Sequence, residues 1–297
     1  MKKMNRKCAY CGSSGKLTKE HVIPDFLYEF AGRGQVGYNA KASKVVKSEH
    51  KVKDVCKECN NIHLSKLDSY GKELFNDNGL DKYHAPDLSI SFNFDYELLL
   101  RFLLKLSYNQ SRMTNKMSYL YSNLKDYILY GSQINCNKNL RLFLEVLSHY
   151  KLTSEDKVKL EKRIKNTIYQ KDEIGDFMYH EKYAIGHIEI LNQESFNSPD
   201  KMPPSIPASY VAINSFFFSL IYFDENLNKQ EIDSFLRNDI PILKYVKRLT
   251  HQNQSTKIKV SRRNISNHLL VQASFNDQKS SWDEYHSNTA YLDKPSK

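Results

Sequence analysis

The chain contains Cys8-Ala9-Tyr10-Cys11-Gly12 and, further along, Val55-Cys56-Lys57-Glu58-Cys59-Asn60-Asn61. Two residues separate the cysteines of each pair, so that a tight turn presents both sulfur atoms to one ion. Zn²⁺ binds four thiolates in a tetrahedron, and each pair supplies half of that set. A thioredoxin-like redox site needs only one pair, so two pairs favour structural zinc. The predicted zinc ligands are Cys8, Cys11, Cys56 and Cys59. The fifth cysteine, Cys136, stands alone and is interpreted as a small, partly buried residue.

The segment around these cysteines is short and basic, so it buries little apolar surface by itself. Zinc binding is therefore expected to contribute on the order of 10 kcal/mol to its folding. A site closed by four cysteines leaves no position for water or substrate, which predicts a structural and not a catalytic role for this zinc.

Between the two cysteine pairs lies Thr18-Lys19-Glu20-His21-Val22-Ile23-Pro24. The three pieces together resemble the HNH endonucleases of the ββα-metal type. They look particularly like a bacterial branch with Cys-x-x-Cys, then Glu-His-x-x-Pro, then Cys-x-x-Cys-Asn-Asn. The resemblance covers roughly residues 8–68. It implies a zinc-stapled, treble-clef-like module in which a hairpin and the following helix hold one divalent cation.

The resemblance also implies roles for individual residues. The family's general base falls on His21, and its acidic cation ligand falls on Glu20. The last motif position, at the start of the helix, falls on Asn60 as a second ligand, with Asn61 or His63 as alternatives. Asp68, further along the same helix, is either a support for the site or a solvated helix residue.

Two features depart from the family pattern. The family's middle Asn, which braces the loop before the second cysteine pair, has no clear equivalent, and His50 and Lys51 stand in its neighbourhood. The branch usually has Gly-Trp-Met after the paired asparagines, where this chain has Ile62-His63-Leu64. The support of the loop is therefore an open question.

These residue types suit phosphodiester hydrolysis independently of the family. A histidine accepts protons near neutral pH and can deprotonate an attacking water. A carboxylate with an amide carbonyl supplies the oxygen ligands that Mg²⁺ prefers. The expected catalytic cofactor is therefore Mg²⁺ or Mn²⁺, which acts as a Lewis acid at the phosphate. The alternatives to these catalytic roles are that His21 is a buried structural histidine and that Glu20 is an ordinary surface residue.

Charge favours a polyanionic partner. The formal net charge is +10, and residues 1–75 hold 15 Lys and Arg against 8 Asp and Glu, a net +7. Lysines release condensed counterions when they bind phosphates, so a basic module suits nucleic acid. The alternative is a solvated strand face. The lysines expected to track phosphates before the second cysteine pair are Lys41, Lys44, Lys47, Lys51 and Lys53.

The chain is predicted to be α+β, with a first domain at 1–78 and a second at 79–297. The turn-forming sequence Asn76-Asp77-Asn78-Gly79 marks the boundary. The second domain is expected to be helical at about 95–172, with Asp95 as a helix cap, and rich in strands at about 183–275. Its polar end, 280–297, is expected to be loose.

A content of 40% hydrophobic and 26% charged residues is typical of a globular protein. No apolar stretch approaches the roughly 18–20 residues of a membrane helix, and the basic N-terminus leads into Cys8 and not into an apolar segment. We therefore expect a cytoplasmic protein that does not bind membranes.

The favoured hypothesis is an HNH endonuclease that cuts double-stranded DNA, in a phage-defence or restriction-type role. The second domain would select the target, regulate the enzyme, or bind another copy or a partner protein. One alternative is a non-catalytic zinc-knuckle protein that binds nucleic acid. Another is a protein-interaction scaffold in which the zinc only stabilises the fold.

Overall fold

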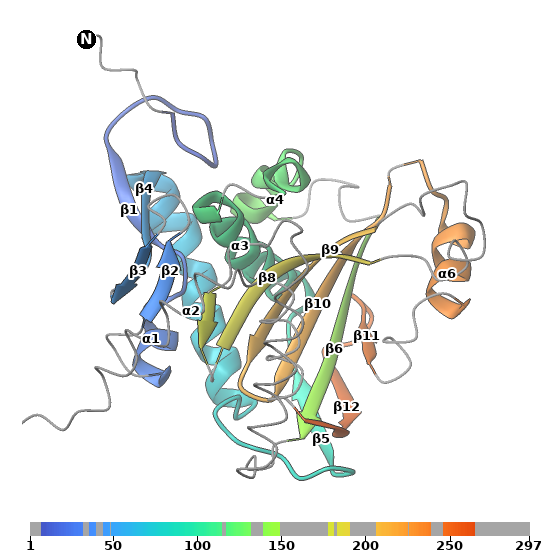
Figure 1. Cartoon of the computed structure of the whole chain (residues 1–297). Helices are drawn as coiled ribbons and strands as arrows, with labels where there is room; N and C mark the ends of the chain where they lie inside the picture. The colour runs from blue at the N-terminus through green and yellow to red at the C-terminus, as the bar shows by residue number, and fades with distance from the viewer. Residues whose placement is uncertain are drawn as a thin grey trace, which may run out of the picture.

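The N-terminal part of the chain is built on a two-stranded antiparallel sheet and the helices that follow its second strand (Figure 1). β1 (Leu17–His21) pairs with β4 (Lys51–Cys56). The chain then turns into η2 (Cys59–Leu64), which continues directly as α2 (Ser65–Asp77). The order strand, strand, helix agrees with the predicted mixture of strands and helices around the cysteines.

The computed structural model describes residues 7–31, 36–39, 44–47, 49–114, 117–131, 139–148, 178–180, 183–190, 206–224, 226–238 and 246–264. Between β1 and β4 lie α1 (Asp25–Ala31) and a second antiparallel pair, β2 (Val36–Asn39) with β3 (Lys44–Lys47). None of the helices in these ranges is long and apolar enough to span a bilayer.

A seven-stranded sheet forms the second part. Its order is β11-β6-β10-β9-β8-β7, with every neighbouring pair antiparallel, and β13 lies parallel to β6. The strands are β6 (Leu140–Ser148), β7 (Met178–His180), β8 (Tyr183–Ile190), β9 (Ile206–Ile213), β10 (Phe216–Tyr222), β11 (Lys247–Leu249) and β13 (Ser261–Asn264). β8, β9 and β10 lie within the segment 183–275 that is predicted to be rich in strands.

Smaller elements complete the second part. A separate pair of strands joins β5 (Ser89–Asn93) to β12 (Ser255–Lys259). The short helices are η3 (Ser118–Tyr121), α4 (Lys125–Tyr130) and α6 (Lys229–Asn238).

One prediction about the second part is wrong. The segment 95–172 was expected to be helical, but β6 lies within it and pairs with β11 and β10 in the large sheet. All nine residues of β6 are buried, so the strand lacks the alternation of polar and apolar residues that marks a half-exposed strand. Cys136, residues 151–172 and residues 265–297 lie outside the described ranges.

The long helix α3 (Tyr96–Thr114) lies between the N-terminal elements and the sheet (Figure 1). Asp95 caps it as predicted, because the amide of Leu98 donates to Asp95 Oδ1 at 2.9 Å. Nearly every residue from Leu99 onward is buried. One continuous hydrophobic cluster extends from Cys8 through α3 to the sheet, and it crosses the predicted boundary at residue 78. The division into two domains stays a prediction.

The close crossing of α2 and α3 depends on Gly71. A Cβ atom at this position would lie 2.4 Å from Cε2 of Phe102, a fully buried ring on α3. We expect Gly71→Ala to lower the free energy of unfolding by about 1–3 kcal/mol, because overpacking outweighs the better helix propensity of alanine. Urea unfolding measures this, with exposed Lys72→Ala as the control. Equal stability of the two variants would mean that Phe102 moves aside freely.

Candidate functional site

The four paired cysteines converge at one point. The sulfur atoms of Cys8, Cys11, Cys56 and Cys59 all lie within 4.8 Å of one another. Sγ of Cys11 and Sγ of Cys56 are 3.7 Å apart. Two thiolates on one zinc ion with bonds of ~2.3 Å stand about 3.8 Å apart in a tetrahedron. The donor set and its spacing therefore fit Zn²⁺, and the cluster can hold a zinc ion.

The thiols of this cluster differ in their environments. Burial, with the crowding of neighbouring thiols, raises the pKa of Cys59. Burial also raises the pKa of Cys11, but hydrogen bonds from Ser13 and from the neighbouring thiols outweigh it and lower the pKa to about 6. A dication among the four sulfurs would favour ionisation of the others, since the thiolate is the metal-binding form.

His21 ends β1 with its side chain 31% exposed. Nε2 of the imidazole lies 3.0 Å from Oε2 of Glu49. The same carboxylate oxygen forms an ion pair with Nζ of Lys51 at 2.9 Å. Asp25, at the start of α1, completes a group whose ligand atoms with His21 and Glu49 all lie within 4.8 Å. A partly exposed histidine therefore stands beside two carboxylates.

The loop that carries Glu49 is braced by backbone contacts. The amide of Val22 donates to the carbonyl of His50 at 2.9 Å, and the amide of His50 donates to the buried hydroxyl of Tyr28 at the same distance. The His50 ring is itself buried, and burial lowers its pKa. Tyr28 and Val22 thus hold the backbone of this loop at His50. The sequence has no clear equivalent of the family's middle Asn in this neighbourhood.

The exposed face of the β1–β4 pair is basic. In the strand register Lys19 lies opposite Lys53, and His21 lies opposite Lys51. Neighbours two apart on a strand share a face, so the three exposed lysines flank His21. Lys44 and Lys47 begin and end β3, and Lys41 lies outside the described residues.

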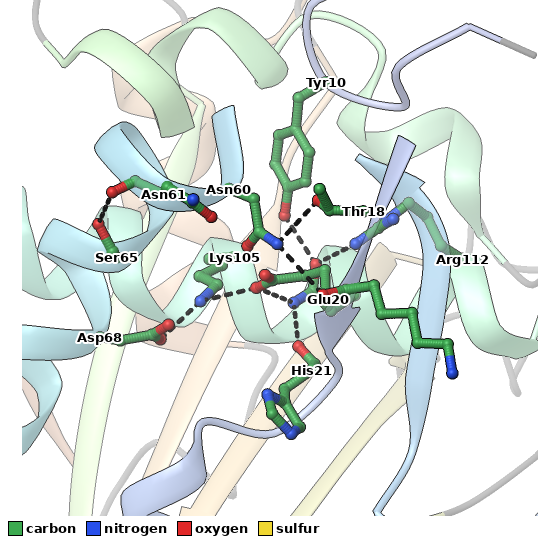
Figure 2. A network of polar contacts seen from close by, with 12 residues as sticks. Tyr10, Thr18, Glu20, His21, Asn60, Asn61, Ser65, Asp68, Lys105 and Arg112 are labelled. Atoms are coloured by element: carbon green, nitrogen blue, oxygen red, sulfur yellow. Dashed lines mark hydrogen bonds and ion pairs between the residues drawn. The ribbon is translucent and has the colours of Figure 1, made fainter. Parts of the chain in front are cut away.

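Glu20 faces the opposite way, into the protein. Its residue is 5% exposed, and its Oε1 is 2.9 Å from Nζ of Lys105 on α3. The same ammonium contacts Oδ1 of Asp68 on α2 at 2.5 Å. Figure 2 shows Lys105 between the two carboxylates while the His21 ring points away from them. Burial lowers the pKa of Lys105, but Asp68 and Glu20 together raise it above its ordinary value, so the ammonium stays charged.

Two further residues of α3 fix the N-terminal elements. Nδ2 of Asn109 donates to the carbonyl oxygen of His21 at 2.9 Å and lies 3.4 Å from Oε1 of Glu20. Oδ1 of Asn109 accepts from the hydroxyl of Tyr10 at 2.7 Å. Arg112 pairs with Asp54 on β4 and lies over the Tyr10 ring at 5.1 Å. Lys105, Asn109 and Arg112 thus share one polar face of α3.

The paired asparagines at the start of η2 have different surroundings. Nδ2 of Asn60 donates to Oγ1 of Thr18 at 2.9 Å and to the carbonyl oxygen of Lys19 at 3.2 Å, which ties the helix to β1. Asn61 is exposed, and its backbone carbonyl accepts from Ser65. His63 makes an edge contact with the exposed ring of Tyr130. The structure therefore places Asn60 at the strand but does not bring the side chain of Asn61 or His63 to His21.

The catalytic cation implied by the family resemblance does not fit at Glu20. The Glu20 carboxylate is buried and already carries the Lys105 ammonium, which argues against the prediction that Glu20 is a ligand of an exchangeable ion. The group of His21, Asp25 and Glu49 is more exposed than Glu20, and only one of its two carboxylates, Glu49, pairs with Lys51.

Sequence reasoning missed Asp25, Glu49, Lys19 and the polar face of α3. Lys105, Asn109 and Arg112 recur at the spacing of one helix face, and this pattern was the available signal for them. No protein-family model matches the chain, and comparison with curated proteins and with solved structures gives no match.

Proposed function

We propose that this protein is a metal-dependent endonuclease of the HNH type that hydrolyses phosphodiester bonds in DNA, with His21 as the general base. The observation that carries the proposal is the position of His21. It stands partly exposed at one end of β1, whose other end pairs with Cys56 of the cluster that can hold zinc, and it lies 3.0 Å from Glu49 with exposed lysines on either side.

His21 and Glu49 form an oriented pair. A carboxylate only accepts hydrogen bonds, so Nε2 of His21 carries the hydrogen and Nδ1 remains to take a proton from water. The water oxygen then attacks phosphorus, the bond from phosphorus to the leaving oxygen breaks, and solvent protonates the leaving oxygen. Glu49 stabilises the imidazolium that forms, as a carboxylate does in hydrolytic triads.

A divalent cation would be held by Asp25 and Glu49, whose carboxylate oxygens suit Mg²⁺ or Mn²⁺. Such an ion supplies positive charge for the phosphate and the leaving oxygen. Lys19, Lys51 and Lys53 lie on the same face as His21 and would bind the flanking phosphates. Contacts to phosphates alone carry no base sequence, so they support binding without specifying a target.

Plasmid nicking by the zinc-loaded protein tests the proposal. We expect conversion of supercoiled DNA to nicked and linear forms with Mg²⁺ or Mn²⁺, and no conversion with a chelator weak enough to leave the zinc in place. The His21→Ala variant, purified in parallel, controls for a contaminating nuclease. Salt-dependent DNA binding without cutting under any metal condition would favour the non-catalytic zinc-knuckle alternative.

The role of Glu49 gives a second measurement. We expect Glu49→Gln to reduce the initial cutting rate by about 10- to 100-fold, because the amide holds the imidazole less firmly and does not neutralise the imidazolium. Glu29→Gln, an exposed acid on α1, is the matched control and should cut at the wild-type rate. Equal rates for the two variants would remove Glu49 from the site.

A further inference from the structure

Lys105 is the most deeply buried charged side chain in the neighbourhood of His21. Its residue is 0% exposed, and its ammonium lies 2.9 Å from Glu20 and 2.5 Å from Asp68. The three groups come from β1, α2 and α3, so they meet only in the folded chain (Figure 2). The buried Glu20 carboxylate and the buried Lys105 ammonium need each other, because either charge alone would be strongly destabilising, and the partly exposed Asp68, with its side chain 34% exposed, adds a second carboxylate to the same ammonium.

The place that Lys105 occupies has the character of a metal site. Oxygen ligands from a strand and from the helix that follows the second cysteine pair converge on it. Lysine supplies a compact point charge on a flexible stem, which suits a small position between carboxylates. The chain therefore provides its own cation where its oxygen ligands meet.

This ammonium also determines the orientation of His21. Neighbouring side chains on a strand point to opposite faces, so holding Glu20 inward turns His21 outward. Asn109, one turn along α3 from Lys105, holds the backbone carbonyl of His21 at 2.9 Å. Helix α3 thus holds the end of β1 twice, through the Glu20 side chain and through the backbone carbonyl of His21.

We propose that Lys105 is a positioning residue whose ammonium takes the place of a divalent cation between Glu20 and Asp68 and so fixes the strand that presents His21. Glu20 then binds this internal cation and not the exchangeable ion of the reaction. The role of Lys105 in presenting a general base rests on the function proposed above, whereas its role as an internal cation does not.

The test is whether a divalent ion replaces the ammonium. We would purify zinc-loaded wild type, Lys105→Ala, Lys105→Gln and the double variant Lys105→Ala/Glu20→Gln, and measure Mn²⁺ binding by calorimetry and thermal unfolding with and without Mn²⁺. We expect Lys105→Ala to bind one Mn²⁺ more than wild type. Saturating Mn²⁺ should raise its unfolding midpoint by about 5–10 °C beyond any shift in wild type. The double variant should lose this gain, and Lys66→Ala, an exposed lysine on α2, should never show it.

Other outcomes overturn the proposal. If Lys105→Ala and Lys105→Gln fold without gaining a Mn²⁺ site, the position is an ion pair with no metal-site character. If neither variant folds even with Mn²⁺ present, the ion does not replace the ammonium, and the proposal fails as well. Absence of nuclease activity in wild type would refute the proposed function but would leave the Mn²⁺ result on Lys105 intact, so the two failures are distinguishable.

Discussion

His21→Ala is expected to reduce plasmid cutting by about 10²- to 10⁴-fold, the usual contribution of a general base. The variant removes the only imidazole in the group formed with Asp25 and Glu49 in the described structure. It should leave the fold intact. The His21 side chain is 31% exposed, and a partly exposed ion pair contributes less than about 1 kcal/mol. Initial rates at saturating Mg²⁺, with zinc content and thermal unfolding measured on the same samples, check this expectation.

The matched control is His63→Ala. His63 lies close to the second cysteine pair but contacts Tyr130 and not the His21 group. We expect this variant to cut at the wild-type rate. If His21→Ala cuts as fast as His63→Ala while folded and zinc-loaded, His21 is not the base, and the basic face of β1 and β4 is then a binding surface only.

Local patterns explain the features that the sequence predicted well. The two cysteine pairs were predicted to form one cluster because ligand spacing within each pair is a property of a single turn. The start of α3 was predictable because a cap depends on residues three apart, as Asp95 and Leu98 show. Both the cysteine cluster and the start of α3 were therefore predictable from residues that lie close together in the sequence.

The features that sequence reasoning missed depend on long-range contacts. The burial of Lys105 depends on its partners Glu20 and Asp68, which come from distant segments of the chain. The predicted helical segment 95–172 includes β6, and a strand buried on both faces has no alternation of polar and apolar residues that would separate it from a helix. Glu49 followed no recognised pattern, because it reaches His21 through the loop that Tyr28 braces.

Cys59→Ser is expected to abolish zinc binding and to lower the unfolding midpoint by at least about 10 °C. A structural zinc supplies on the order of 10 kcal/mol of folding free energy, and each kcal/mol corresponds to roughly 2–4 °C in a chain of this size. Cys59 is 2% exposed and begins η2, so a serine there leaves both a poor ligand and a buried hydroxyl. Zinc content by elemental analysis and calorimetric unfolding measure the two effects.

The control is Cys136→Ser, which removes the one thiol that the sequence places outside the cluster and should change neither quantity. A wild-type protein without bound zinc, or a Cys59→Ser variant that keeps it, would contradict the assignment of the four cysteines.

The effect of zinc loss should reach the His21 site through the contacts between the cysteine cluster and α3. Tyr10 lies between Cys8 and Cys11, and its hydroxyl donates to Asn109, which in turn holds the carbonyl of His21. Opening the cluster releases Tyr10 and thereby one support of β1. Cys59→Ser is therefore expected to lose DNA cutting at temperatures below its own unfolding midpoint, where the large sheet is still folded by near-ultraviolet circular dichroism. Cutting that persists up to the midpoint would show that α3 holds His21 without help from the cysteine cluster.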